Sequence, residues 1–172
     1  MGVVPPIKTA GEVSQTRVIG LLATEATVTR PYVRNLAAQF AADCTLVAIG
    51  SATLAEMAEE KLRGRTADLG SLRELLSPFF DNPAAPVDTV VLGCTHYPLL
   101  LDEFRHVSPP DVAWLDCSPA VARRLQQVLE DQLPSSQRVT DHVLFAAPLG
   151  EEPALRAYLA GMGFGEPEDF PD

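Results

Sequence analysis

Short apolar runs alternate along this chain with longer segments in which apolar residues recur at helical spacing. The runs cover residues 18–23, 46–49, 89–92, 112–115 and 143–146. Each is short enough for a buried strand and is followed by polar residues, glycine or proline. Strands that alternate with helices in this way are typical of a parallel sheet covered by helices. We therefore predict an α/β protein built on a parallel sheet.

The segments between these runs carry their apolar residues on one helical face. They predict helices over residues 32–40, 53–62, 71–80, 118–129 and 155–162. Capping boxes mark two of the starts, at Thr53 and Ser71, and Pro78 predicts a bend or an early end of the third helix. The residues of the fourth helix that we expect to face the interior are Val121, Leu125, Val128 and Leu129.

One strand leads directly into a cluster of reactive side chains. After residues 89–92 the chain reads Gly93-Cys94-Thr95-His96-Tyr97-Pro98, and a predicted helix follows. A thiol at a strand tip and ahead of a helix N-terminus is favoured in its thiolate form. His96 can move protons near neutral pH, and Thr95 can hydrogen-bond a substrate. Cys94 is thus a candidate base or nucleophile, and the alternative is a buried loop cysteine beside an ordinary histidine.

The stretch VLGCTHYPLL resembles the second catalytic cysteine motif of the glutamate racemases, and the resemblance extends from about Val3 to Phe164. Residues 18–28 are similar to the strand and threonine loop that open the family's second domain, and residues 115–124 to the segment that returns to its first domain. Residues 50–62 resemble a Gram-negative branch that depends on a cell-wall precursor as activator. The resemblance implies an aspartate/glutamate racemase-like α/β domain followed by a partial second α/β domain.

The family's first catalytic cysteine lies in a Cys-Asn-Thr motif, which this sequence does not contain. The Asp-Ser and Tyr-Gly pairs that grip the substrate in the family are also missing. We therefore expect the later part of a glutamate racemase. Its predicted parts are a linker at 1–17 that leaves a missing first domain, an α/β domain with the catalytic cysteine at 18–107, the remainder of the other domain at 108–164, and a frayed tail at 165–172.

The resemblance also implies a reaction, which is cofactor-free inversion at the α-carbon of glutamate. One thiol removes the proton from one face, and a second thiol returns a proton to the other. Cys94 would be the base that acts on L-glutamate, His96 would assist its protonation state, and Thr95 would hold the substrate. The implied setting is the cytoplasm, where D-glutamate is supplied for peptidoglycan and a UDP-linked cell-wall precursor is the activator. With one thiol missing, we expect the chain to be inactive alone.

Two threonines are weaker candidates for substrate binding. Thr24 and Thr27 follow the first strand, at the carboxyl edge where parallel sheets bind ligands. Their alternative role is to cap the next helix. Thr27 matches a threonine of the family, so the resemblance favours a substrate role for it, although Ala26 stands where the family usually has glycine.

The remaining cysteines and histidines are interpreted as non-catalytic. Cys44 is expected to pack in the core, and Cys117 stands where the family commonly has serine. His106 and His142 are isolated and are read as surface or capping residues. A metal site is not expected, because Cys94 and His96 supply at most two ligands and no second pair has ligand spacing.

Composition argues against several other classes of protein. A net charge of −10 disfavours nucleic-acid binding, which needs clustered basic residues. No apolar run has the length of a membrane span, and the N-terminus lacks a signal-like segment. Three scattered cysteines make no disulfide framework and suit a reducing compartment.

Two other functions stay open. A Cys-dependent hydrolase or transferase would use Cys94 to attack a carbonyl, with His96 as its base. A non-catalytic remnant would keep the fold and ligand affinity without turnover. Because a sheet that lacks strands leaves open edges and apolar faces, we also expect the later part of the chain to associate with a second copy or with the missing region.

Overall fold

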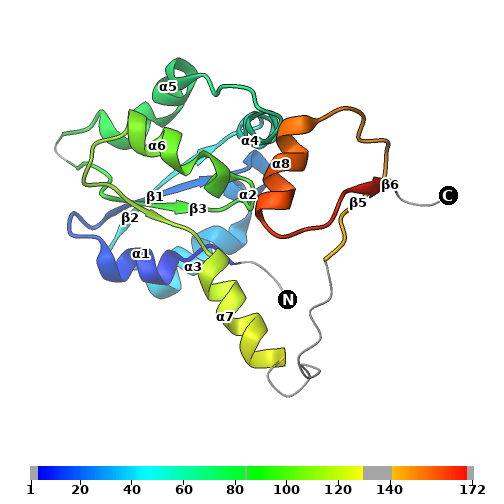
Figure 1. The fold of residues 1–172 in the computed structure, drawn as a ribbon. Helices are drawn as coiled ribbons and strands as arrows, with labels where there is room; N and C mark the ends of the chain where they lie inside the picture. Colours follow the sequence, from blue (N-terminus) through cyan, green and yellow to red (C-terminus); the bar gives the residue numbers. More distant parts are fainter. Residues whose placement is uncertain (1–3, 84, 130–140, 170–172) are drawn as a thin grey trace.

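The structure, a computed structural model, describes residues 4–83, 85–129 and 141–169. Its main sheet has four parallel strands in the order β2-β1-β3-β4 (Figure 1). These strands are β1 (Val18–Ala23), β2 (Thr45–Gly50), β3 (Thr89–Leu92) and β4 (Ala113–Leu115). A separate pair, β5 (Leu144–Phe145) and β6 (Glu168–Asp169), is also parallel. The predicted α/β class with a parallel sheet is confirmed.

Helices cover both faces of the main sheet, so this part of the molecule has three layers. In Figure 1, α1 and α3 lie on one side of the sheet, and α5 and α6 lie on the other. The helices are α1 (Ile7–Val13), α2 (Glu25–Val28), α3 (Pro31–Phe40), α4 (Leu54–Leu62), α5 (Leu69–Phe80), the 3-10 helix η1 (Tyr97–Leu100), α6 (Leu101–Val107), α7 (Ser118–Leu129) and α8 (Pro153–Gly161). Within the described ranges, no helix is long and apolar enough to cross a membrane.

Strand β1 is central, and its side chains divide the core in two. Ile19 and Leu21 pack with residues of α1 and α3 on one face. Leu22 points to the other face, where it packs with residues of α4, α5 and α6. All six residues of β1 are buried, which agrees with a strand covered on both sides.

The first segment is more ordered than the predicted linker at 1–17, because residues 7–13 form α1 and bury Ile7 and Ala10 against the sheet. The link to β1 is held by Asp88, whose carboxylate accepts hydrogen bonds from Ser14 Oγ at 2.7 Å, Gln15 N at 2.6 Å and Thr16 N at 2.8 Å. Partial burial acts to raise the pKa of Asp88, but these hydrogen bonds outweigh it, so the pKa lies below its usual value.

The strand that follows the predicted boundary at residue 108 belongs to the main sheet. β4 pairs with β3 through Thr89↔Ala113 and Val91↔Leu115. This differs from the prediction that residues 108–164 lie in the other domain. The rest of the predicted division stays a prediction. The tail also differs, because Glu168 and Asp169 form β6 instead of fraying.

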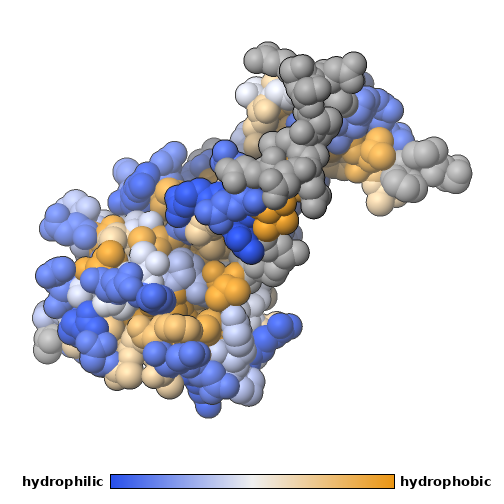
Figure 2. Space-filling view, turned by 90° about the horizontal axis from the view of Figure 1, so that it is seen from below, coloured by the Kyte–Doolittle hydropathy of each residue, from blue (hydrophilic) through white to orange (hydrophobic). Residues whose placement is uncertain are grey.

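Helix α7 forms where it is predicted, but its apolar stripe does not face an interior. No residue of α7 is buried, and Leu125 and Val128 are each 47% exposed. Figure 2, which views the molecule from below, shows that hydrophobic residues reach the surface between hydrophilic ones. The first turn of α7 borders an apolar cavity of about 320 Å³, which it shares with the first residues of the described chain and with α3. Cavity-lining residues include Ile7, Leu36, Phe40, Cys117 and Val121. The expected inward orientation is therefore wrong for Leu125 and Val128.

Helix starts also differ from the capping-box predictions. Ser51 Oγ accepts the backbone N–H of Leu54 at 3.2 Å, and Thr53 makes no side-chain cap bond. Helix α5 begins two residues before Ser71, because Asp68 caps it by accepting from Gly70 N and Ser71 N. Pro78 lies inside α5, in its last turn, and the helix continues to Phe80.

Candidate active site

The carboxyl ends of two neighbouring strands, β1 and β3, bring the candidate residues to one edge of the sheet. Leu22 of β1 pairs with Leu92 of β3 in parallel register, so the residues that follow both strands emerge side by side. Thr24 follows β1, and Cys94 follows β3 after Gly93. Gly93 donates its N–H to Leu22 O at 2.8 Å, and a Cβ at this position would lie only 2.8 Å from Ala23 Cβ. Only glycine allows the two strand ends to approach so closely.

Cys94, His96 and Glu59 form a linear polar chain. Cys94 Sγ lies 3.8 Å from His96 Nδ1, and His96 Nε2 lies 3.1 Å from Glu59 Oε1. An ionised carboxylate can only accept a hydrogen bond, so Nε2 carries the ring hydrogen. The Nδ1 of the neutral ring is then an acceptor that faces the thiol. The side chains of His96 and Glu59 are 41% and 46% exposed, so a substrate and solvent can reach them.

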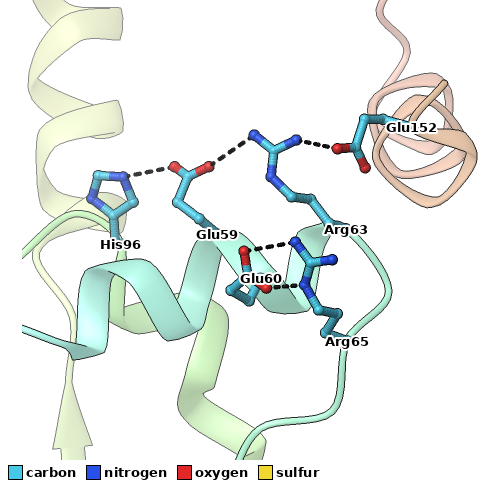
Figure 3. A network of polar contacts seen from close by, with 6 residues as sticks. All are labelled: Glu59, Glu60, Arg63, Arg65, His96 and Glu152. Carbon is cyan, nitrogen blue, oxygen red and sulfur yellow. Dashed lines mark hydrogen bonds and ion pairs between the residues drawn. The ribbon is translucent and has the colours of Figure 1, made fainter. Parts of the chain in front are cut away.

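The polar chain continues along α4 to the C-terminal helix α8. Glu59 Oε2 lies 4.0 Å from Arg63 Nη2, one helical turn later. Arg63 Nη1 in turn lies 2.7 Å from Glu152 Oε1, at the start of α8. Figure 3 shows these side chains in sequence, from His96 through Glu59 and Arg63 to Glu152. A separate ion pair joins Glu60 of α4 to Arg65, in the segment that follows the helix (Figure 3).

The turn behind Cys94 is held by Tyr97. Its N–H donates to Cys94 O at 3.2 Å, and its hydroxyl donates to Ser51 O at 3.3 Å. Burial of the ring, with a smaller contribution from Cys94, raises the pKa of Tyr97. The helix predicted after Cys94 begins as the 3-10 helix η1 and becomes α-helical only at Leu101.

Of the three predicted threonines, Thr24 and Thr27 contact each other and Thr95 lies apart from them. Thr24 Oγ1 and Thr27 Oγ1 lie 2.9 Å apart, both half-buried at the edge of the sheet. Thr24 makes no side-chain cap bond to α2, so the alternative capping role is not observed for it. Thr95 is exposed beside Cys94.

The other two cysteines lie in settings that disfavour a thiolate. Burial, and secondarily the negative charge of Asp116, raises the pKa of Cys117. Cys117 lines the apolar cavity beside α3 and α7. Burial also raises the pKa of Cys44, which packs against the core face of α1 and α3 as predicted. Neither thiol is therefore prepared to act as a base at neutral pH.

The other two histidines lie on the surface, away from Cys94. His106 is exposed on α6, and His142 pairs with Glu168 at 3.3 Å on the surface. In the part of the chain that the structure describes, no three His, Cys, Asp or Glu side chains are grouped so that they could hold a metal ion.

Glu59 is the site residue that sequence reasoning missed. It lies within the acidic run Glu56-Met-Ala-Glu59-Glu60, and its spacing does not distinguish it from its neighbours. Only the packing of α4 beside the turn at Tyr97 brings its carboxylate to His96. A thiol, an imidazole and a carboxylate in this order can move a proton to or from a bound substrate, or generate a nucleophilic thiolate.

No family model matches the chain. In curated sequences, the chain is 42% identical over 176 residues to the glutamate racemase of Salmonella enteritidis, an alignment that covers 99% of this chain and 60% of the relative. It is 41% identical over 172 residues to the glutamate racemase of Klebsiella pneumoniae, with the same coverage of both. The chain thus spans about 60% of the length of these relatives.

A solved structure agrees with the sequence relatives. The crystal structure of Escherichia coli glutamate racemase, in complex with L-glutamate and the activator UDP-MurNAc-Ala, matches with a TM-score of 0.88. The two chains are 37% identical over 99% of this chain and 64% of the E. coli chain. The same fold therefore extends over almost all of the present chain.

Proposed function

We infer that the chain belongs to the glutamate racemase family, and we propose that it carries one half of a two-thiol racemase site. The observation that carries this proposal is the 42% identity to a glutamate racemase over 99% of the chain, together with a thiol aligned on an imidazole and a carboxylate. Because the chain spans only about 60% of its relatives, the activity of the whole enzyme is part of the proposal.

In the proposed reaction, Cys94 is the base on one face of the substrate. His96 Nδ1 takes the proton of the thiol, and the resulting thiolate removes the α-proton of L-glutamate. The electron pair of the broken C–H bond stays on the α-carbon, next to the carboxylate. Hydrogen-bond donors at the edge of the sheet would stabilise this carbanion-like state in a closed cleft. No step requires a cofactor.

The roles of the other site residues follow from their contacts. Glu59 holds the Nε2–H of His96 and so keeps Nδ1 directed at the thiol. The exposed hydroxyl of Thr95 and the bonded pair of Thr24 and Thr27 would hold the polar groups of the substrate. These three threonines lie after β1 and β3, at the edge where parallel sheets bind ligands.

The partners in the proposal are L- and D-glutamate and, as activator, a UDP-linked cell-wall precursor. The E. coli structure that contains L-glutamate and UDP-MurNAc-Ala supports both classes of ligand. We propose that the enzyme acts in the cytoplasm and supplies D-glutamate for peptidoglycan.

The test is hydrogen exchange at the α-carbon in deuterium oxide, followed by proton NMR for each enantiomer of glutamate. With one prepared thiol, the 172-residue chain should exchange the α-proton of L-glutamate slowly, without inverting it. Replacement Cys94→Ser should abolish the exchange, and the matched Cys44→Ser variant should retain it. No exchange by a folded wild-type chain in the presence of the activator would contradict the proposal for this chain alone.

The same assay separates the alternatives. The thiol, imidazole and carboxylate of this site are also the groups of a Cys-dependent hydrolase or transferase. A covalent acyl adduct on Cys94, found by mass spectrometry after incubation with activated esters and without any α-proton exchange, would favour that function. Binding of glutamate without exchange or adduct would identify a non-catalytic remnant.

A further inference from the structure

Arg63 lies between two carboxylates that belong to different parts of the molecule. Its Nη1 lies 2.7 Å from Glu152 on the α8 side, and its Nη2 lies 4.0 Å from Glu59 on the His96 side. The side chains of Arg63 and Glu152 are only 26% and 27% exposed, whereas that of Glu59 is 46% exposed. The better shielded and shorter of the two ion pairs is therefore the one with Glu152.

The end of α4 that carries Arg63 is fixed on both sides. Lys61 Nζ donates to Leu99 O at 2.7 Å and pairs with Glu103 at 2.8 Å, which ties α4 to η1 and α6. On the other side, Gly64 has a positive φ of 85°, and a Cβ there would lie 3.1 Å from Ala154 Cβ of α8. The backbone at Arg63 is thus tied to η1 and α6 on one side and lies close to α8 on the other, so the rearrangement that we consider is one of side chains.

Glu59 can serve two partners, and the strength of one pairing affects the other. Its Oε1 accepts from His96, and its Oε2 faces Arg63. A guanidinium binds a carboxylate best through two parallel hydrogen bonds, which would engage both oxygens of Glu59. Such a bidentate pair would draw Glu59 away from His96. In the observed arrangement the guanidinium of Arg63 is paired with Glu152, so the carboxylate of Glu59 keeps its hydrogen bond with the imidazole of His96.

We propose that Glu152 is a positioning residue for the thiol site: at the start of α8, it holds Arg63 away from Glu59, so that Glu59 stays bonded to His96 and Cys94 stays reactive. Helix α8 would then control the site through one guanidinium. The inference rests on the proposed function of Cys94 and His96, but it concerns the reactivity of the thiol and not turnover.

The test measures the rate at which iodoacetamide alkylates Cys94 at neutral pH in the whole chain, followed by mass spectrometry. In Glu152→Gln the guanidinium turns to the remaining charged carboxylate, Glu59, and alkylation should slow about two- to fivefold. Arg63→Gln removes the guanidinium that competes with His96 for the carboxylate of Glu59, so alkylation should not slow. The double variant should behave like Arg63→Gln, because Glu152 acts only through Arg63.

The opposite behaviour of the two single variants is what distinguishes positioning from a structural role. Both variants break the same ion pair between α4 and α8, so a bridge that only held the helices together would slow alkylation equally in both. Equal slowing, or an unchanged rate in Glu152→Gln, overturns the proposal. Arg65→Gln, which breaks the neighbouring ion pair with Glu60, is the matched control and should leave the rate unchanged. Because the readout needs no glutamate, a failed exchange assay leaves this test intact.

Discussion

Cys94 Sγ and His96 Nδ1 lie 3.8 Å apart within a single turn, and the ring is held from behind by Glu59. The turn has no freedom to separate them, because Gly93 is bonded to β1 and Tyr97 is bonded to the backbone of both Cys94 and Ser51. The thiol and the imidazole are therefore held next to each other in the absence of any ligand. Preparation of this kind lowers the cost of reaching a reactive geometry.

Cys94 should be the first cysteine to react with iodoacetamide at neutral pH. Its thiol faces an imidazole, whereas burial raises the pKa of both Cys44 and Cys117. Mass-spectrometric mapping of the three thiols checks the order, and D-glutamate should protect Cys94. Earlier labelling of Cys44, or an unchanged rate with glutamate, would argue against an active-site role.

Glu59→Gln should lower the rate of α-proton exchange by about tenfold or more, within the usual range for groups that serve acid–base catalysis. The amide can present its NH₂ group to His96, which would favour the wrong ring tautomer. The measurement is NMR exchange in deuterium oxide, with Glu56→Gln as the control because Glu56 is exposed one turn earlier on α4. Equal exchange rates in the Glu59→Gln and Glu56→Gln variants would show that Glu59 has no role in the exchange.

Asp88→Asn should destabilise the fold by about 1–3 kcal/mol at neutral pH, because an amide cannot accept from all three donors. The folded pKa of Asp88 is lowered, so its stabilisation is present above the unfolded value of about 3.9 and is lost as pH falls through the folded value. Urea unfolding at pH 7 and below pH 3 should thus show a difference between wild type and variant that shrinks in acid. A difference that is constant with pH would mean that the charge of Asp88 is not involved.

Tyr97→Phe should cost about 1 kcal/mol, the usual net value of one hydrogen bond. The folded pKa of Tyr97 is raised, so its stabilisation is complete below the unfolded value of about 10 and declines as pH rises above it. Relative to the Phe variant, the wild type should lose stability only in alkali. In an absorbance titration of the folded protein, the ionisation that the Phe variant lacks should occur above the usual range of a tyrosine, and ionisation of Tyr97 within that range would show that its ring is not buried.

The exposed apolar stripe of α7 should make the chain associate. Replacing Leu125 and Val128 together by Gln should give a monomer by light scattering, while Arg123→Gln on the opposite face should not. Hydrogen exchange should be faster in residues 141–169 than in β1 and β3. A monodisperse wild-type monomer, with equally slow exchange in both parts, would contradict this expectation.

β1 and β3 could be predicted because burial on both faces makes each of them a continuous apolar run, whereas the apolar runs of β2 and β4 are only partly buried. β1 has the predicted bounds, and Cys94 lies at the predicted strand tip. Helix starts were less predictable, because Ser51 and Asp68 cap helices at positions outside the expected motifs. Several residue types can cap, and only the path of the backbone decides which one does.

Three further features depend on contacts between distant segments and could not be predicted locally. Asp88 holds the link before β1 from more than seventy positions away, Glu59 reaches His96 from another helix, and Glu152 reaches Arg63 from α8. Helix α7 shows the opposite problem. The spacing of its apolar residues predicts that they are buried, but the spacing does not identify the surface that would cover them.

The central position of β1 has a consequence for the order in which the nascent chain can fold. Ile19 pairs with Thr89, and Ile7 of α1 shares a core cluster with Val91, so neither can complete its packing until β3 has left the ribosome. Until then β1 has β2 as its single neighbour and presents an unpaired apolar edge. Pairings this far apart in sequence form slowly. A pause in translation while Thr89 is still inside the ribosome should therefore yield an intermediate that needs a chaperone, whereas a pause after Leu92 has emerged from it should not.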